Sequence, residues 1–185
     1  MMQAMGEPGI GANSHAGYPV GTRNEFVAFY RVAIGPVYRS ASRLVGGDRQ
    51  RCDDLVQEAF LDLIREVRAG RITSVDIGWM IVAVRHRFID SLRRREREER
   101  RLELVWTRQT AAADMSADTD SSEQLTLLLA RVPDSQRAAV VLHHVDGLSV
   151  AEVAAALGKS THATESLLAR GRDQLRRLLT ETSDD

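Results

Sequence analysis

Residues 159–170, KSTHATESLLAR, carry polar side chains of the kinds that read DNA bases. Hydroxyl, carboxylate and guanidinium groups form hydrogen bonds with base edges in the major groove. A helix presents such groups to the groove when a short helix and a tight turn precede it. An ordinary helical hairpin is the alternative interpretation, because this pattern produces false positives. The candidate residues are Lys159, Ser160, Thr161, His162, Glu165, Ser166 and Arg170.

A basic stretch lies near the middle of the chain. Between residues 85 and 101 there are eight arginines and four acidic residues, although the net charge of the whole chain is −1. Such a stretch can neutralise DNA phosphates and release their counterions. The alternative is a solvated helix end, where arginine interacts favourably with the helix dipole. The candidate DNA-binding arginines are Arg85, Arg87, Arg93, Arg94 and Arg95.

Residues 53–66, DDLVQEAFLDLIRE, predict a helix with one acidic face. A DNA-binding module has little use for acidic side chains, so this face suggests a basic protein partner. A solvated face is again the simpler alternative.

The residue types that catalyse reactions or bind metals are not grouped in this sequence. His143 and His144 are adjacent, so on a helix they point about 100° apart and do not easily share a metal. Cys52 is the only cysteine. It begins a predicted helix, where a thiolate can be favoured, but no histidine or acid-base arrangement accompanies it. We therefore predict no catalytic residue, no metal site and no cofactor. An enzyme with a helical lid stays an alternative that would need such a cluster or a phosphate-binding loop.

Helical periodicity in residues 23–105 indicates three helices around a small core. The first has an apolar stripe that includes Phe26 and Tyr30, ends at Leu44, and is expected to kink at Pro36. The second and third are expected over about 53–68 and 78–99, with a loop at 69–77.

Residues 123–180 indicate a second helical block. After two short helices, Ser149 and Glu152 have the spacing of a capping box and begin another helix. Gly158 lies in the following turn, and the last helix runs over about 161–179. The residues of this helix expected to face the core are Thr164, Leu168, Gly171 and Leu175.

The remaining segments are expected to be unstructured. Residues 1–22 are rich in glycine and proline and predict a disordered tail. Residues 106–122 are small, polar and acidic and predict a flexible linker, and 181–185 predict an acidic tail. The predicted fold is therefore all-α, with two small helical domains joined by a linker. The absence of a signal peptide, of a membrane-spanning run and of cysteine pairs favours the cytoplasm.

Three stretches together resemble bacterial RNA polymerase sigma factors of the extracytoplasmic-function (ECF) type in the sigma-70 family. Residues 53–66 resemble the helix of sigma region 2 that docks on the clamp helices of the polymerase largest subunit. WMIVAVRHRFIDSLRRR, at 79–95, resembles the helix that reads and melts the −10 element. Residues 129–179 resemble region 4, which reads the −35 element. The order and spacing match the ECF type, which keeps only these two domains.

The resemblance implies roles for individual residues. Asp54, Gln57 and Glu58 would contact the polymerase core. Loop 69–77 would capture a flipped base, without a single residue being identified for this. Trp79 would either stack on a base or, by the stronger interpretation, pack in the core. Partners would be core polymerase, promoter DNA and an anti-sigma factor, with no membrane contact.

The sequence departs from the family pattern in the last helix. Family members usually carry a basic residue at the positions of Glu165 and Leu167, and valine at those of Thr161 and Thr164. Loss of two positive charges at a phosphate surface would flatten the salt dependence of DNA binding by about two units. Glu165 would instead accept a hydrogen bond from a cytosine amino group.

A helix-turn-helix regulator that binds duplex DNA as a dimer, without polymerase, is the rival interpretation. It leaves the acidic helix and the arginine-rich helix unexplained. Binding to core polymerase as a monomer would separate the two.

Overall fold

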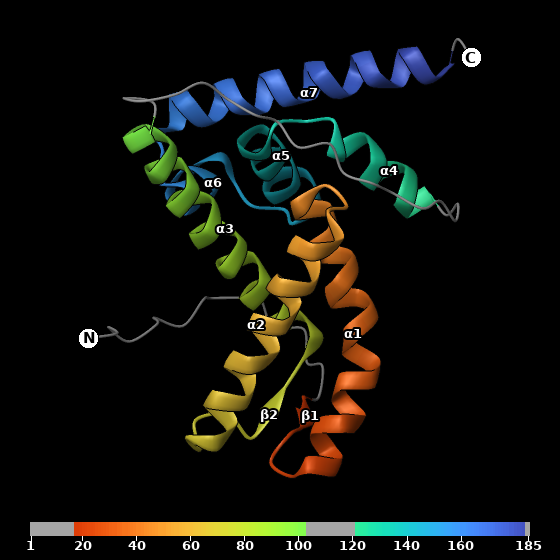
Figure 1. Cartoon of the computed structure of the whole chain (residues 1–185), viewed down its shortest axis with the longest axis vertical. Coiled ribbons are helices and arrows are strands. Elements are labelled where there is room, and N and C mark those ends of the chain that lie inside the picture. The colour runs from red at the N-terminus through yellow and green to blue at the C-terminus, as the bar shows by residue number, and fades with distance from the viewer. Residues whose placement is uncertain (1–16, 103–120, 184–185) are drawn as a thin grey trace.

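The computed structural model describes residues 17–102 and 121–183, which form two helical halves (Figure 1). We call residues 17–102 the N-terminal half and residues 121–183 the C-terminal half. The predicted all-α class with two helical domains is confirmed, and the only strands in the described residues are two residues long. None of the described helices is long and apolar enough to cross a membrane.

Three helices build the N-terminal half: α1 (Arg23–Val45), α2 (Arg49–Arg68) and α3 (Ile77–Leu102). They pack against one another as the three amphipathic patterns predict (Figure 1). The largest fully buried side chains come from all three helices: Phe29, Val37, Leu44, Leu63, Met80, Val84 and Phe88.

The apolar stripe of α1 differs from the predicted one at its start. Phe29 is fully buried, whereas Tyr30, which the stripe was predicted to include, is 41% exposed. The ring of Tyr30 covers Phe60 of α2 from outside, with 4.9 Å between ring centroids. The helix continues through Pro36, and from Ala33 to Leu44 the predicted buried positions are confirmed.

Side-chain caps set the helix starts. Thr22 and Glu25 form a capping box that begins α1, which the sequence analysis did not identify. Asp48 accepts a hydrogen bond from the Arg51 amide at 3.1 Å, so α2 begins at Arg49 rather than near Asp53.

The N-terminal segment is ordered from residue 17. Strand β1 (Tyr18–Pro19) pairs antiparallel with β2 (Ser74–Val75), and the Val20 amide donates to the Thr73 carbonyl at 3.0 Å. Val20 is 1% exposed. The disordered tail predicted over 1–22 is therefore wrong for residues 17–22, because a two-strand ladder and a buried valine hold them. Residues 1–16 lie outside the described part of the chain.

The C-terminal half contains α4 (Ser121–Ala130), α5 (Asp134–Val140), the π-helical turn η1 (Val141–Val145), α6 (Val150–Leu157) and α7 (Thr161–Ser183). Helix α7 crosses the other helices of this half along one edge of the molecule (Figure 1). Helix α4 includes residues 121–122 of the predicted linker. Helix α7 extends past its predicted end near 179 and includes residues 181–183 of the predicted tail. The rest of the predicted linker, 106–120, lies outside the described residues. The main buried side chains are Leu129, Val132, Leu142, Val153, Leu168 and Leu178.

Gly171 is required where α7 crosses α5. A Cβ atom at this position would lie 2.7 Å from Cγ2 of Val140 and 3.3 Å from the Gln136 carbonyl oxygen. We expect Gly171→Ala to lower the free energy of unfolding by about 1–2 kcal/mol, although alanine favours helices, because overpacking costs more than the propensity gain. Urea denaturation followed by circular dichroism measures this.

Gly35→Ala is the matched control, because Gly35 also lies inside a helix. Apart from its two chain neighbours, its Cβ atom would meet only the end of the Arg39 side chain, at 3.5 Å. The propensity gain there is offset by crowding from the ring of Pro36, so we expect a change within about 0.5 kcal/mol. Equal effects of the two substitutions would contradict the crossing argument.

Candidate nucleic-acid and polymerase interfaces

Helices α6 and α7 form a helix-turn-helix. The Ser149 hydroxyl accepts from the Glu152 amide at 3.3 Å, and Glu152 Oε2 accepts from the Ser149 amide at 2.8 Å. The predicted capping box is thus confirmed. Gly158 ends α6 in the left-handed region, with φ of 64°, and so turns the chain into α7.

The N-terminal end of α7 is open to solvent. Ser160 caps the helix by accepting from the Ala163 amide at 3.2 Å, and Thr161, His162 and Glu165 are exposed. Ser166 is half-buried. The polar residues predicted to face DNA are therefore gathered on one helix end, and their contact with bases stays a prediction.

The inner face of α7 matches the predicted one. Thr164 is fully buried, and its hydroxyl donates to the Ser160 carbonyl at 3.0 Å. Leu168 and Gly171 are buried and Leu175 is half-buried.

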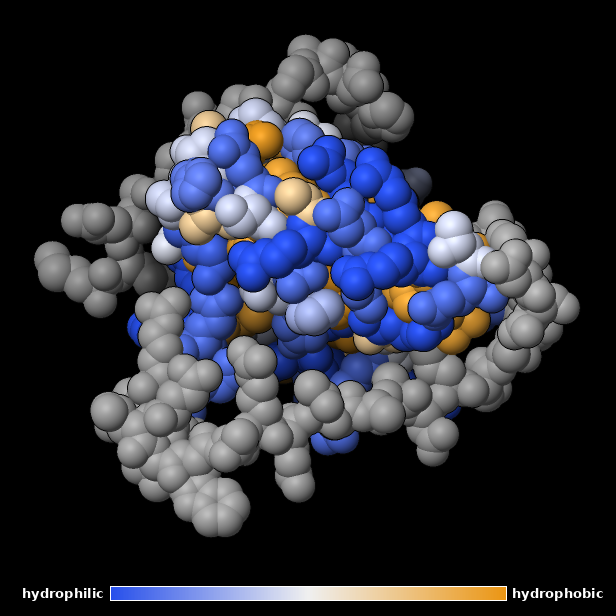
Figure 2. All heavy atoms as spheres, turned by 90° about the horizontal axis from the view of Figure 1, so that it is seen from above, coloured by the Kyte–Doolittle hydropathy of each residue, from blue (hydrophilic) through white to orange (hydrophobic). Residues whose placement is uncertain are grey.

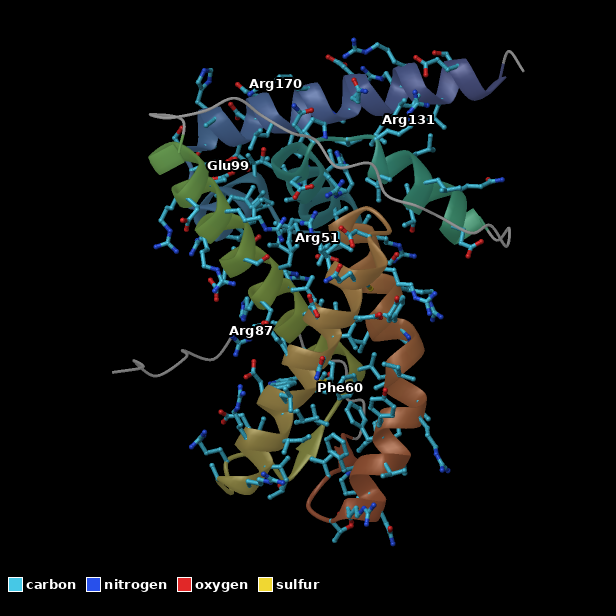
Figure 3. All side chains as sticks on the ribbon, viewed as in Figure 1. Arg51, Phe60, Arg87, Glu99, Arg131 and Arg170 are labelled. Carbon is cyan, nitrogen blue, oxygen red and sulfur yellow. The ribbon has the colours of Figure 1, made fainter. Side chains whose placement is uncertain are left out.

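Two further residues of α7 differ in exposure: Leu167 is buried and Arg170 is exposed. Leu167 is only 8% exposed and belongs to the apolar core. Leu167 therefore does not belong to a phosphate-facing surface. The prediction that a positive charge is lost from that surface at two positions, 165 and 167, is wrong for position 167. Arg170 is exposed and lies on α7 (Figure 3). The molecule seen from above is mainly hydrophilic (Figure 2).

Two of the five candidate arginines of α3 are separate from the C-terminal half. Arg87 pairs with Asp62 of α2, and its Nε donates to Oδ2 at 2.6 Å. This pair fixes the side chain between two helices of the same half (Figure 3). Arg94 is exposed.

The acidic face of α2 is exposed to solvent. Asp54, Gln57 and Glu58 are all exposed, at helical spacings of three and four residues. Leu61 continues the same face and is 39% exposed. Leu61 is not among the predicted contact residues, although its position three residues after Glu58 could have identified it. An apolar side chain beside acidic ones is typical of a protein-binding surface.

Comparisons with known proteins agree with this division. Residues 29–98 match the family model for Sigma-70 region 2, and residues 122–175 match that for Sigma-70, region 4. Over 165 residues the chain is 31% identical to the ECF RNA polymerase sigma factor SigM of Mycobacterium tuberculosis, covering 89% of this chain and 82% of SigM. This protein is an ECF sigma factor of the sigma-70 family. It directs RNA polymerase to promoters and is not an enzyme.

Other relatives and one solved structure are similar to this sigma factor. The RNA polymerase sigma-E factor of Streptomyces coelicolor is 33% identical over 155 residues, covering 82% of this chain and 84% of that protein. SigE of Mycolicibacterium smegmatis is 32% identical over 164 residues, and the match spans 59% of its length. The sigma factor RpoE of Bartonella quintana, solved in complex with the anti-sigma factor NepR, shares the fold. Its TM-score is 0.51 at 21% identity, covering 85% of this chain and 98% of that one.

The other arginines of α3 reach the C-terminal half of the sigma factor. Arg85 pairs with Asp146 at 2.9 Å, Arg95 pairs with Asp134 at 3.3 Å, and Arg93 donates to the Ala155 carbonyl at 2.8 Å. Lys159, a candidate residue for the −35 element, pairs with Glu96 of α3 at 2.9 Å. The two predicted DNA-binding sets are therefore brought together, which the sequence analysis did not predict.

Burial and neighbouring arginines shift the pKa values of two aspartates of the C-terminal half that pair with α3. Burial would raise the pKa of Asp134, but Arg137, Arg51 and Arg95 together hold it below its ordinary value. Burial raises the pKa of Asp146, against the lowering effect of Arg85.

The loop before α3 of the sigma factor is partly structured. Strand β2 and the first helical residue, Ile77, lie inside the predicted loop 69–77. Thr73 and Ser74 are exposed, and Arg71 donates to Glu66 at 2.8 Å. Asp76 begins α3 by accepting from the Trp79 amide at 2.7 Å. Trp79 is half-buried against the core, as the stronger interpretation expected.

Cys52 and His143, which were considered for catalysis or metal binding, have structural contacts. Cys52 is 1% exposed, and burial raises the pKa of its thiol to about 12, so a thiolate is not favoured there. His143 Nδ1 lies 2.6 Å from the Leu148 carbonyl oxygen. Among the described residues, no group of three His, Cys, Asp or Glu side chains could hold a metal ion.

Proposed function

We propose that this sigma factor recruits core polymerase through α2 and recognises promoters through both DNA elements. Helix α3 and loop 69–77 act at the −10 element, and the exposed N-terminal end of α7 acts at the −35 element. The observation that carries this proposal is the separation of charge in one half: an acidic face on α2 and arginines on α3.

The polymerase contact is proposed for Asp54, Gln57 and Glu58, with Leu61 beside them. Their partner would be the clamp helices of the largest subunit. Four exposed side chains on one helix face, three polar and one apolar at the C-terminal end of the face, suit a helix-helix contact.

The −10 contact is proposed for the five arginines of α3, with loop 69–77 capturing a flipped base. A flipped base needs small polar groups and backbone around it, and Thr73 and Ser74 are exposed for this. Arg85, Arg93 and Arg95 must first leave their partners in the C-terminal half to reach DNA.

An anti-sigma factor is a further proposed partner, and the cytoplasm is the proposed location. The solved complex of the Bartonella quintana protein with NepR supports the first proposal, because its fold is shared. The second follows from the partners, since polymerase and promoter DNA lie in the cytoplasm of a bacterium.

Run-off transcription on a promoter library, with and without this protein, tests the proposed function. Transcripts that share −10 and −35 elements are expected only when the sigma factor is added to core polymerase. DNA binding without core binding would instead support a plain helix-turn-helix regulator.

The Glu165 carboxylate is proposed to read a base of the −35 element. Substitution Glu165→Arg is expected to change preference at one base pair by roughly 1–3 kcal/mol, because arginine donates to guanine where glutamate accepts from cytosine. Binding to a panel of −35 variants at fixed salt measures this.

Asp173→Arg is the control, because Asp173 is exposed on the same helix about two turns further along. It should tighten binding evenly across the panel through phosphate attraction alone. An equally even gain from Glu165→Arg would rule out base reading at this position.

A further inference from the structure

The loop proposed to capture a base, 69–77, is fixed at both ends by its neighbours in the chain. Near its start, Arg71 forms a bidentate ion pair with Glu66 of α2, in which Nη2 donates to Oε1 at 2.8 Å and Nε donates to Oε2 at 2.5 Å. At its end, Asp76 accepts from the Trp79 amide at 2.7 Å and so caps α3. These contacts fix the two ends of the loop, and they do not reach the residues in its middle.

The middle of the loop is held by the N-terminal segment of the chain. Strand β1 pairs with β2, so that Pro19 lies opposite Ser74. One residue further on, the Val20 amide donates to the Thr73 carbonyl at 3.0 Å. Both of these loop residues are exposed. We call residues 17–20 the strap, because they lie across the loop and join it to the start of α1.

Gly17 allows the strap to approach the loop closely. A Cβ atom at this position would lie 3.3 Å from both Cβ and Oγ of Ser74 and 3.4 Å from the Val75 amide nitrogen. These distances are shorter than the optimal separation of nonbonded carbon atoms, so a side chain at position 17 would push on the loop. The backbone of the strap therefore packs directly against the residues proposed to surround the base.

The strap is itself anchored to the core of the N-terminal half. Val20 is 1% exposed and belongs to the main apolar cluster. The ring of Tyr18 lies against Phe29 of α1, with 5.5 Å between the ring centroids. Immediately after the strap, Thr22 caps α1 by accepting from the Glu25 amide at 3.3 Å. The strap is thus fixed to α1, and it passes that fixed position on to the loop.

The anchors of the strap and the exposed residues of the loop face different surroundings. Tyr18 and Val20 are two residues apart and both contact the core, as alternate residues of a strand do. Their neighbour Pro19 is exposed. Because Val20 is almost completely buried, it is not available to DNA. Any effect of Val20 on base capture must therefore act through the loop.

We propose that the strap positions the −10 loop: it holds Thr73 and Ser74 in the arrangement that accepts a flipped base, without touching the base itself. This inference rests on the proposed function of loop 69–77. An extruded base is bound in a closely fitting pocket, and a binding site works only when its groups are held within about 0.5 Å of the productive geometry. The ladder supplies this precision in the middle of the loop, where its end contacts do not.

The strap also lowers the entropy cost of capturing a base. Ordering a loop costs conformational entropy, and with the strap in place the loop is already ordered when DNA arrives. If a released loop is in the competent arrangement about one-tenth of the time, the affinity for an unpaired −10 strand falls about tenfold. A two-residue ladder contributes little to global stability, so the effect belongs to base capture.

The strap lies far from the other two proposed interfaces. Figure 1 shows β1 and β2 at the end of the N-terminal half that is farthest from the C-terminal half, with α7 at the opposite end of the molecule. Asp54, of the proposed polymerase contact, lies about four turns before the end of α2. Changes in the strap should therefore leave core binding and −35 binding nearly unaltered.

The double substitution Tyr18→Ala, Val20→Ala tests the strap in the full chain. It removes both anchors and keeps every proposed DNA contact. Holoenzyme, formed with saturating core polymerase, is titrated with a fork-junction DNA that carries 2-aminopurine in its unpaired −10 strand, whose fluorescence rises when a base leaves the stack. We expect fork-junction affinity to fall about tenfold, and affinities for core polymerase and for a −35 duplex to stay within about twofold of wild type.

Hydrogen exchange followed by mass spectrometry measures the hold of the strap on the loop directly. Peptides that cover residues 70–76 should exchange about tenfold faster in the double variant, whereas peptides of α2 should be unchanged. Unchanged exchange in the loop would overturn the proposal. Faster exchange without a loss of fork-junction affinity would overturn it equally.

Tyr30→Ala, Val37→Ala is the matched control. Tyr30 is 41% exposed and covers a phenylalanine ring, as the 42% exposed Tyr18 does, and Val37 is fully buried. Neither control residue belongs to the ladder. The control should keep fork-junction affinity within about twofold of wild type. Equal losses in the two double variants would mean that general destabilisation, and not the strap, is responsible.

Two single substitutions separate positioning from direct contact. Tyr18→Phe keeps the ring on Phe29 and should keep fork-junction affinity, whereas a loss as large as that of the double variant would mean that the phenol contacts DNA and would overturn the positioning role. Val20→Ala alone should reduce fork-junction affinity about threefold, and it provides the test if the double variant does not fold.

Failure of the strap and failure of the proposed function are distinguishable. A wild-type holoenzyme that gives no 2-aminopurine signal, or a Thr73→Ala, Ser74→Ala variant that keeps full fork-junction affinity, would contradict base capture by the loop. Hydrogen exchange would still decide whether the strap holds the loop. A wild-type signal that the strap variant retains in full would overturn the strap alone.

Discussion

Reversal of the acidic face, Asp54→Arg with Glu58→Arg, is expected to weaken binding to core polymerase by about 100-fold. Both side chains are exposed and lie four residues apart on α2. Placing arginines against a basic partner surface replaces attraction by repulsion, and like charges facing each other at an interface cost several kcal/mol. Run-off transcription should fall with the loss of binding. Titration of labelled protein with core polymerase at moderate salt measures the affinity.

Stability should hardly change in this variant, because arginine favours helices and the two sites face solvent. Asp173→Arg with Glu181→Arg changes the net charge equally on α7 and is the control for nonspecific effects. Comparable losses in the two variants would mean that overall charge, rather than this face, determines polymerase binding. Substitution Leu61→Ala should give a smaller loss, because an exposed leucine contributes through apolar area alone.

The helices themselves could be predicted from local pattern. Apolar spacing locates α1 and α7, and the Ser149–Glu152 pair marks the start of α6 within one residue. These features depend on neighbours within one or two turns, so a single sequence contains the information. For the same reason the exposed faces of α2 and of the start of α7 could be predicted.

The sequence could not indicate the contacts between distant segments. Strand β1 pairs with a segment more than fifty residues away, and a two-residue strand in a glycine-rich stretch has no periodic signal. Arg51 and Asp134 are 83 positions apart, and each looks like an ordinary surface charge. Charges have no periodicity that identifies a partner.

Leu167 shows that the exposure of a side chain within a helix could not always be predicted from the sequence. Its position suggested a surface residue because relatives usually carry a basic residue there, yet it is buried at 8% exposure. Packing against the other helices of the C-terminal half, which α7 contacts, determines which of its side chains are covered. The salt dependence of −35 binding should therefore be reduced by about one charge, at Glu165, rather than two.

Removal of the Arg137 side chain is expected to be the most destabilising single change in the C-terminal half. Its guanidinium donates to the carbonyls of Leu129, Val132 and Leu44 at 2.9–3.1 Å, and it pairs with Asp134. The Leu44 carbonyl lies in the last turn of α1, where no amide of the same helix is available. Arg137→Ala would leave the Leu44 and Val132 carbonyls without their side-chain donor, while the Leu129 carbonyl still accepts from the Val132 amide, and it would leave a cavity.

Such a loss costs about 3–5 kcal/mol, which corresponds to a fall in the melting temperature of roughly 10 °C for a chain of this size. Thermal and urea denaturation, followed by circular dichroism, measure it. Arg131→Ala is the matched control, because Arg131 pairs with Glu181 while both side chains are more than half exposed. That pair should contribute less than about 1 kcal/mol.

Substitution Arg137→Lys separates charge from geometry. Lysine keeps the charge beside Asp134 but cannot donate in three directions from a planar group, so it should recover less than half of the lost stability. Full recovery would mean that charge alone is needed, and the hydrogen bonds to the three carbonyls would then contribute little. If Arg137→Ala were no worse than Arg131→Ala, the buried arginine would not be the connection between α1 and the C-terminal half that its contacts indicate.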